Sequence, residues 1–316
     1  MADVKMVATR DAYGSELANL VHDDDRVLVL DADLAEATKT GMVKKAYPDR
    51  FVDCGIAEQN MVGIAAGLAT CGKTVFASSF AMFLAGRAFE QIRNSIGYPH
   101  LNVKLCATHA GISVGEDGAT HQCCEDIALM RTIPGMVVLN PADEVETRAA
   151  VRAVAAYDGP VYMRLGRLAV PVLFDETYQF EIGKGVLLRE GSDVTIIATG
   201  LMVGEALEAA KRLEQEKIQA RVVNIHTIKP LDTELIAQSA AKTGAIVVAE
   251  EHNILGGLGA AVAETVCERC PVPVLRVGVE DTFGRSGPAK KLLEIYGLTA
   301  EHIVSRAKEA VQFKMR

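Results

Sequence analysis

The chain has 316 residues, of which 49% are hydrophobic and 23% charged, and its formal net charge is −8. This apolar content excludes a disordered chain, and the length predicts about two domains. The acidic balance, without a Lys/Arg-rich run, argues against binding to nucleic acid or a membrane surface. The sequence has no signal peptide, no apolar run long enough to span a bilayer, and seven cysteines, so we expect a cytoplasmic protein with reduced thiols.

Short apolar runs alternate with segments of helical periodicity along the whole chain. Strands are predicted, in order, at Val27–Leu30, Thr74–Ala77, Val103–Thr108, Met136–Leu139, Val161–Leu165, Val194–Ala198, Ala220–Ile225, Ala245–Ala249 and Pro273–Val277. Helices are predicted at Asp11–His22, Ala57–Cys71, Met82–Ser95, Asp143–Ala156, Val203–Glu216 and Gly259–Arg269. Strands that are apolar throughout and separated by helices are typical of a mostly parallel sheet with helices on both faces. The fold class is therefore α/β.

The alternating pattern breaks at residues 171–184, PVLFDETYQFEIGK, which are aromatic, charged and not periodic. We therefore predict a first domain at 1–172, a linker at 173–184 and a second domain at 185–316. Ligands of parallel α/β sheets bind beyond the carboxyl ends of the strands. Polar residues at these positions are denser in the first domain, so we expect the chemistry there.

Glu58 begins a helix that is small and apolar after Asn60, in the segment CGIAEQNMVGIAAGLATC. This pattern predicts a helix buried on every face. The simpler interpretation of Glu58 is an acid that stabilises the helix N-terminus. Because a buried carboxyl is costly unless it is paired, the alternative is that Glu58 meets a basic group on a ligand.

Two further segments carry candidate site residues. Phe80 and Phe83 follow a strand and share a face if the segment is helical; they either pack in the core or flank a flat aromatic ring. The segment ATHAGISVGEDGATHQC contains three glycines with His109, Glu116, Asp117 and His121, which suggests the polar wall of a pocket. No compact facial triad is evident, so we predict no metal ligands in this chain.

Two motifs in the second domain are interpreted as structural. Cys267 and Cys270 form a Cys-x-x-Cys that lacks the second ligand pair of a zinc site, so we expect an inert pair. Gly256, Gly257 and Gly259 open a helix after a strand, where an anion can bind, but their spacing is not that of a dinucleotide fingerprint and favours packing.

Taken together, GIAEQN around Glu58, the Phe80/Phe83 pair and THAGISVGEDGATHQ resemble the pyrimidine-binding domain of transketolase, and the second domain resembles the transketolase C-terminal domain. The resemblance implies a thiamine diphosphate enzyme that transfers a two-carbon ketol unit between sugar phosphates, as in the pentose phosphate pathway. The cofactor would carry the chemistry, and Glu58 would share a proton with its aminopyrimidine ring.

The resemblance also implies roles for other residues. Phe80 and Phe83 would hold the aminopyrimidine, and Asp33 would lie near the thiazolium. Arg10 and Arg164 would bind the substrate phosphate with help from His109, Asp117 would meet a substrate hydroxyl, and His121 would act near the reacting carbon. The sequence departs from the family at Gly86, where full-length enzymes have an aromatic residue, and at Ala37, where they have a serine.

The family's Gly-Asp-Gly motif followed by Asn, which binds the diphosphate and Mg²⁺, does not occur in this chain. The resemblance therefore implies the C-terminal subunit of a split transketolase, active with an N-terminal partner that holds Mg²⁺, in an α2β2 heterotetramer. Half of a 1-deoxyxylulose 5-phosphate synthase, the beta subunit of a 2-oxoacid dehydrogenase and a noncatalytic regulatory subunit remain alternatives. A nicotinamide-dependent oxidoreductase is disfavoured because the glycine fingerprint is missing.

Overall fold

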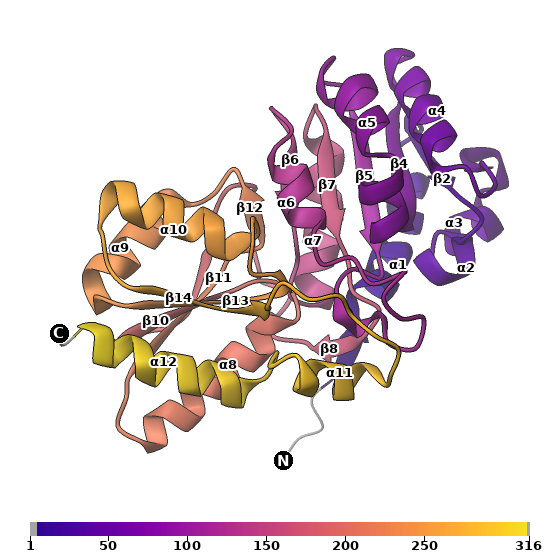
Figure 1. The fold of residues 1–316 in the computed structure, drawn as a ribbon. Coiled ribbons are helices and arrows are strands. Elements are labelled where there is room, and N and C mark those ends of the chain that lie inside the picture. The colour runs from indigo at the N-terminus through magenta and orange to yellow at the C-terminus, as the bar shows by residue number, and fades with distance from the viewer. Residues whose placement is uncertain (1–4, 315–316) are drawn as a thin grey trace.

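The computed structural model describes residues 5–314 and contains two large, mostly parallel sheets. Within this range the first sheet has seven strands in the order β12-β6-β7-β5-β4-β2-β3, and the second has five in the order β14-β13-β10-β11-β9. Figure 1 shows the two sheets side by side with helices around them. The α/β class with helices on both faces of parallel sheets is confirmed.

The strands form where the apolar runs occur. Their bounds are β1 Met6–Ala8, β2 Val27–Asp31, β3 Phe51–Asp53, β4 Thr74–Phe80, β5 Val103–Thr108, β6 Val137–Leu139, β7 Val161–Arg164, β8 Ala169–Pro171, β9 Val186–Arg189, β10 Val194–Ala198, β11 Ala220–Asn224, β12 Thr227–Lys229, β13 Ile246–Asn253 and β14 Val274–Val279. All seven residues of β4 and all six of β5 are buried, which is the pattern of a sheet covered on both faces. β1 and β8 form a separate antiparallel pair.

The helices pack their apolar faces against the sheets. Their bounds are α1 Thr9–Asp23, α2 Ala35–Thr38, α3 Gly41–Ala46, α4 Glu58–Thr70, α5 Phe89–Gln91, α6 Asp126–Arg131, α7 Glu144–Ala156, α8 Met202–Gln215, α9 Thr233–Thr243, α10 Leu258–Arg269, α11 Ala289–Ile295 and α12 Ala300–Lys314. Helices α1 and α7 share one core with the first sheet, whereas α4 and α6 share another on its opposite face. No helix in the described range is both long and apolar enough to cross a membrane.

The two predicted domains are joined more closely than their separate patterns suggested. Strand β12 comes from the predicted second domain but pairs antiparallel with β6 of the first sheet. One continuous apolar cluster also contains buried residues of both sheets, from Leu30 to Val248 and Val266. The boundaries at 172 and 185 stay a prediction, since the first sheet includes a strand from beyond them.

Two predicted helices differ in the structure. Residues 82–95 form two π-helical segments, Met82–Arg87 and Ile92–Gly97, on either side of the short α5. The prediction that α4 is buried on every face was wrong, because Gly63 and Gly67 are exposed and a Cβ at either would meet no atom within 4 Å. Small residues indicate that another segment can pack closely against the helix. They do not indicate whether that segment belongs to this chain.

Candidate active site

The Glu58 carboxyl is the most buried ionisable group of the predicted site, with 1% of the residue exposed. It lies in the first turn of α4, which follows the carboxyl end of β3. Oε2 accepts a hydrogen bond of 2.7 Å from Nη1 of Arg87, in the π-helical segment that follows β4. No other hydrogen bond joins the Glu58 side chain to residues 5–314, so Oε1 is free of protein donors there.

Phe80 and Phe83 lie close together although they are not on one helix. Phe80 ends β4 and Phe83 lies in the π-helical segment, yet their rings are nearly parallel, with centroids 5.8 Å apart and an interplanar angle of 14°. Phe80 stacks on the His109 ring at 3.8 Å, and the His121 ring meets Phe83 edge-on at 5.1 Å. Four predicted site residues from two segments of the sequence therefore form one aromatic group.

The hydrogen bonds of His109 define its tautomer. Arg10 Nη1 lies 2.9 Å from Nε2, and because a guanidinium can only donate, Nε2 must accept. Nδ1 therefore carries the proton and donates to Oγ1 of Thr108 at 2.9 Å. Burial, together with the nearby Arg10 and Arg167 charges, lowers the pKa of His109 to about 3. His109 is a neutral imidazole across the ordinary pH range.

Arg10 is fixed at the edge of this group. Its Nη1 also donates to the backbone oxygen of Ala37 at 3.2 Å, while its Nε is buried without a partner. Burial lowers the pKa of Arg10, and the Arg167 charge adds to that effect, so the two cations lie close enough to interact. A buried, unpartnered guanidinium nitrogen is a donor suited to an anionic ligand.

Arg164 does not belong to this group, contrary to its predicted phosphate role. Its side chain is 4% exposed; Nε donates to Oδ2 of Asp126 at 2.8 Å, and Nη2 donates to the backbone oxygen of Glu251 at 2.7 Å. It thus joins the first sheet to β13 and has no open face for a phosphate. Arg167, three residues later, is partly exposed and influences both Arg10 and His109. The sequence did contain a signal for this alternative, because Arg167 is a second arginine in the segment Arg164-Leu-Gly-Arg167.

The remaining predicted residues lie at the exposed margin. Asp33 is exposed, adopts a φ of 62°, and its backbone N–H donates to Oδ1 of Asp53 at 3.1 Å. Asp117 is also exposed, on the turn between Gly115 and Gly118, which have φ values of 88° and 79°. The structure gives neither carboxylate a direct contact with Glu58 or His109.

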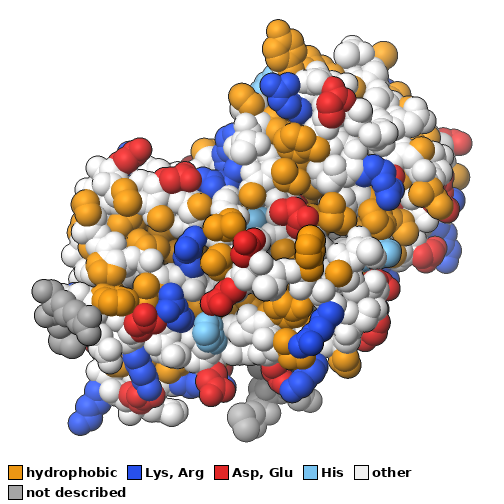
Figure 2. All heavy atoms as spheres, in the orientation of Figure 1, with side chains coloured by type: hydrophobic (Ala, Val, Ile, Leu, Met, Phe, Trp, Pro, Cys, Tyr) orange, Lys and Arg blue, Asp and Glu red, His pale blue; other side chains and the backbone are white. Residues whose placement is uncertain are grey.

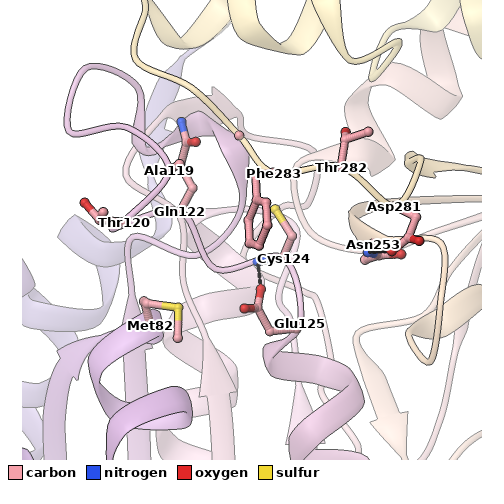
Figure 3. Close-up of a pocket in the computed structure, with 11 residues that line it drawn as sticks. Met82, Ala119, Thr120, Gln122, Cys124, Glu125, Asn253, Asp281, Thr282 and Phe283 are labelled. Carbon is pink, nitrogen blue, oxygen red and sulfur yellow. Dashed lines mark hydrogen bonds between the residues drawn. The ribbon is translucent and has the colours of Figure 1, made fainter.

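A cavity of about 530 Å³ lies beside the aromatic group and was not predicted. Figure 3 shows that its lining comes from Met82, the loop 119–125 and the segment 281–284 between β14 and α11. Met82 also explains the departure at Gly86, because a Cβ there would lie 2.1 Å from Met82 Cε. The methionine therefore fills the space above this glycine.

The two second-domain motifs are structural here. The N-terminus of α10 is occupied by the Glu250 carboxylate, which accepts from the backbone N–H groups of Leu258 and Gly259 at 2.7 and 2.8 Å. An internal carboxylate thus takes the position where an external anion was considered. Cys267 and Cys270 are free thiols at the end of α10, one exposed and one half-buried.

The fold and this site define an α/β protein with two large sheets, in which a buried glutamate and a group of Phe and His rings follow parallel strands of the first sheet. Residues 5–172 match the family model of the transketolase pyrimidine binding domain, and residues 183–303 match that of the transketolase C-terminal domain. The chain belongs to the transketolase family and corresponds to the C-terminal half of its single-chain members.

Individual relatives agree with this assignment. The chain is 51% identical over 96% of its length to a putative transketolase C-terminal section of Methanocaldococcus jannaschii, covering 96% of that protein. It is 47% identical, over 96% of its length and 95% of the relative's, to a 6-deoxy-6-sulfo-D-fructose transketolase subunit of a Clostridium species. It is 41% identical to mouse transketolase over 96% of this chain but only 49% of the mouse protein.

A solved structure described as a split gene transketolase, inactive beta4 tetramer, superposes with a TM-score of 0.91 at 55% identity, covering 98% of this chain and 99% of that one. Transketolase from Campylobacter jejuni superposes with a TM-score of 0.82 at 26% identity, over 96% of this chain and 47% of that one.

Proposed function

We propose that this chain is the C-terminal subunit of a split, thiamine diphosphate-dependent transketolase that acts together with an N-terminal partner. The observation that carries the proposal is the Glu58 carboxyl, which is buried, has one oxygen free of donors from residues 5–314, and is paired with Arg87, whose guanidinium lies over the Phe83 ring. A free carboxylate oxygen next to aromatic rings suits a flat, basic heterocycle.

The residues present fit the aminopyrimidine half of the cofactor. When bound, thiamine diphosphate supplies the carbon nucleophile of ketol transfer. Glu58 holds and returns a proton at the ring nitrogen, Phe83 and Phe80 set the plane of the ring, and His121 lies at the edge of Phe83 toward the substrate side. Asp33, at the exposed margin, is proposed to face the thiazolium.

The phosphate end of the substrate is proposed to bind at Arg10 and Arg167, with neutral His109 between Arg10 and the Phe80 ring. We propose Arg167 in this role instead of Arg164, because Arg164 is already hydrogen-bonded to Asp126 and to the Glu251 backbone. Asp117, on the exposed turn, is proposed to accept from a substrate hydroxyl. We propose sugar phosphates as substrates; one relative is named for 6-deoxy-6-sulfo-D-fructose, a sulfonate, and another for apulose 4-phosphate, and both sugars carry an anionic group that arginines can bind.

Two observations support the need for a partner: the diphosphate-binding motif is missing from this sequence, and α4 has an exposed face. The chain matches about half of mouse transketolase, and the diphosphate-binding Gly-Asp-Gly motif is missing from its sequence. Gly63 and Gly67 leave an open face on the helix that carries Glu58, while Ile56 just before it is 78% exposed. We propose that an N-terminal subunit holding Mg²⁺ covers this face in an α2β2 assembly.

Reconstitution tests the proposal. The chain is mixed with its N-terminal partner, Mg²⁺ and thiamine diphosphate, and ketol transfer from a ketose phosphate to an aldose phosphate is measured, with pyruvate as the competing donor. The complex should turn over the ketose phosphate, the chain alone should not, and Glu58→Gln should lower kcat by about 10²–10⁴-fold because the proton exchange is lost.

Each result has a contrary outcome. Robust turnover by the chain alone contradicts the split, and turnover of pyruvate alone points to a synthase or dehydrogenase half instead. Unchanged activity of Glu58→Gln in the complex indicates a noncatalytic subunit. Glu264→Gln serves as the control, because Glu264 is an exposed residue of α10 that pairs with Arg131.

A further inference from the structure

Arg87 is held against Glu58 by three separate contacts. Its guanidinium donates to Glu58 Oε2 at 2.7 Å and lies over the Phe83 ring, with Cζ 4.8 Å from the centroid. Its backbone oxygen accepts from Nε2 of Gln59 at 3.1 Å. The arginine therefore contacts the carboxylate, the neighbouring aromatic ring and the first turn of α4.

These contacts constrain Glu58 rather than Arg87. The Glu58 side chain is 2% exposed, whereas the Arg87 side chain is 49% exposed. A buried carboxyl without a partner is strongly disfavoured, and Arg87 supplies a cationic partner to Oε2. Oε1 has no donor within residues 5–314.

The Phe83 ring makes this arrangement specific for arginine. A planar guanidinium can lie over an aromatic face and donate to a carboxylate at the same time, which an ammonium group does less well. The same ring is proposed to set the plane of the aminopyrimidine. One arginine thus sets the relative position of the catalytic carboxylate and the aromatic ring.

We propose that Arg87 is a positioning residue that holds Glu58 Oε2 so that Oε1 faces the aminopyrimidine nitrogen. This inference rests on the proposed function and deepens it, since Arg87 acts on the cofactor only through Glu58. Small displacements of a reacting group lower rates strongly, by about 10²-fold for about 1 Å.

The test is a double-mutant cycle in the complex reconstituted with the N-terminal partner. Arg87→Met removes the charge and keeps the aliphatic stem, Arg87→Lys keeps the charge, and each is combined with wild-type Glu58 or Glu58→Gln. Isothermal titration with thiamine diphosphate in Mg²⁺ gives the cofactor dissociation constant, steady-state kinetics gives kcat and KM, and sedimentation velocity reports assembly. Arg93→Met is the matched control, because Arg93 is an exposed arginine of the next π-helical segment, Ile92–Gly97.

Arg87→Met should lower kcat by about tenfold or more, with little change in donor KM, and weaken cofactor binding about threefold or more. Arg87→Lys should recover part of both losses. In the Glu58→Gln background, Arg87→Met should change the dissociation constant less than about twofold, since the carboxylate it positions is gone. Arg93→Met should match wild type in every measurement.

Three results would overturn the inference. Wild-type kcat and cofactor affinity in Arg87→Met exclude a positioning role. Equal losses from Arg87→Met with Glu58 and with Gln at 58, or losses that follow weaker assembly, show that Arg87 serves the subunit interface instead. A wild-type complex without ketol transfer refutes the proposed function itself, and this role with it.

Discussion

Two arginine–carboxylate pairs lie near the carboxyl ends of the first sheet, and they differ in what surrounds them. Arg164 and Asp126 are 4% and 0% exposed; Tyr162 also donates to Asp126 Oδ2 and the Glu251 backbone oxygen accepts from Arg164, while Asp126 Oδ1 is buried without a partner. Arg87 and Glu58 are 49% and 2% exposed, and the arginine's other polar and ring contacts within residues 5–314 are with the Gln59 amide and the Phe83 ring. The same chemical groups thus form two different pairs. We call Arg164–Asp126 the closed pair and Arg87–Glu58 the open pair.

The difference separates a structural role from a functional one more clearly than residue type does. The closed pair joins the two sheets, because Arg164 on β7 reaches Asp126 on α6 and the backbone of β13. The open pair leaves a carboxylate oxygen and two aromatic rings available to a ligand. On the face shown in Figure 2, acidic and basic side chains are interspersed, so the net charge of −8 alone does not mark the site.

Breaking the closed pair should have the largest effect on stability. Arg164→Ala should lower the free energy of unfolding by about 3–5 kcal/mol, because it leaves the Asp126 carboxylate buried without its partner. Denaturant unfolding of the chain measures this. Arg212→Ala, at an exposed pair with Glu208 on α8, should leave the midpoint nearly unchanged. Similar midpoints for both variants would mean that the closed pair does not join the sheets.

Glu251, in the closed region, should contribute to the pH dependence of stability. Burial raises the pKa of Glu251 to about 7, although Arg164 and Ser113 oppose the shift. The folded state then binds a proton that the unfolded state releases above pH about 4.5, so this contribution to stability is complete below that pH and is lost as the pH rises through 7.

Glu251→Gln removes the titration while the Gln oxygen can still accept from the backbone N–H of Ser113. Relative to wild type, the variant should gain up to about 2–3 kcal/mol between pH 4.5 and 8, which urea unfolding at several pH values measures. A difference in stability that stays constant with pH would show that Glu251 is ionised throughout.

The smallest of these effects is expected for Arg167, at the exposed edge of the site. Arg167→Ala should raise KM for a phosphorylated donor by about tenfold, because a charged hydrogen bond to phosphate is lost, and should leave the unfolding midpoint unchanged. Arg164→Met should instead lower stability without a selective change in KM. The reverse result, with the KM effect at Arg164, would restore the original assignment of the phosphate site.

Much of the fold could be predicted because strands and helices are marked by local apolar patterns. Val103–Thr108 and Val194–Ala198 were predicted with the observed bounds, and α4 and α7 to within one or two residues. Short edge strands such as β3 and β12 were missed, since three residues carry little periodicity. The helix predicted at 82–95 was interrupted by π-helical segments that no local pattern indicates.

The candidate site was partly predicted for a similar reason. Glu58, Phe80, Phe83, His109 and His121 stand in recognisable segments, and the structure brings all five into one region through their direct contacts and through Arg87. Arg87 was not predicted, because its partner is 29 residues away in sequence.

The amino-acid sequence alone determined the α/β class, the family and the segments that carry the chemistry, because hydrophobic periodicity and short motifs are local properties of the chain. Only the tertiary structure decided which arginine is buried and which is open. Arg164 and Arg167 are three residues apart, but Arg164 is buried against the backbone of β13, whereas Arg167 is partly exposed and pairs with Glu116. Burial depends on neighbours brought from distant parts of the chain, and no local pattern encodes it.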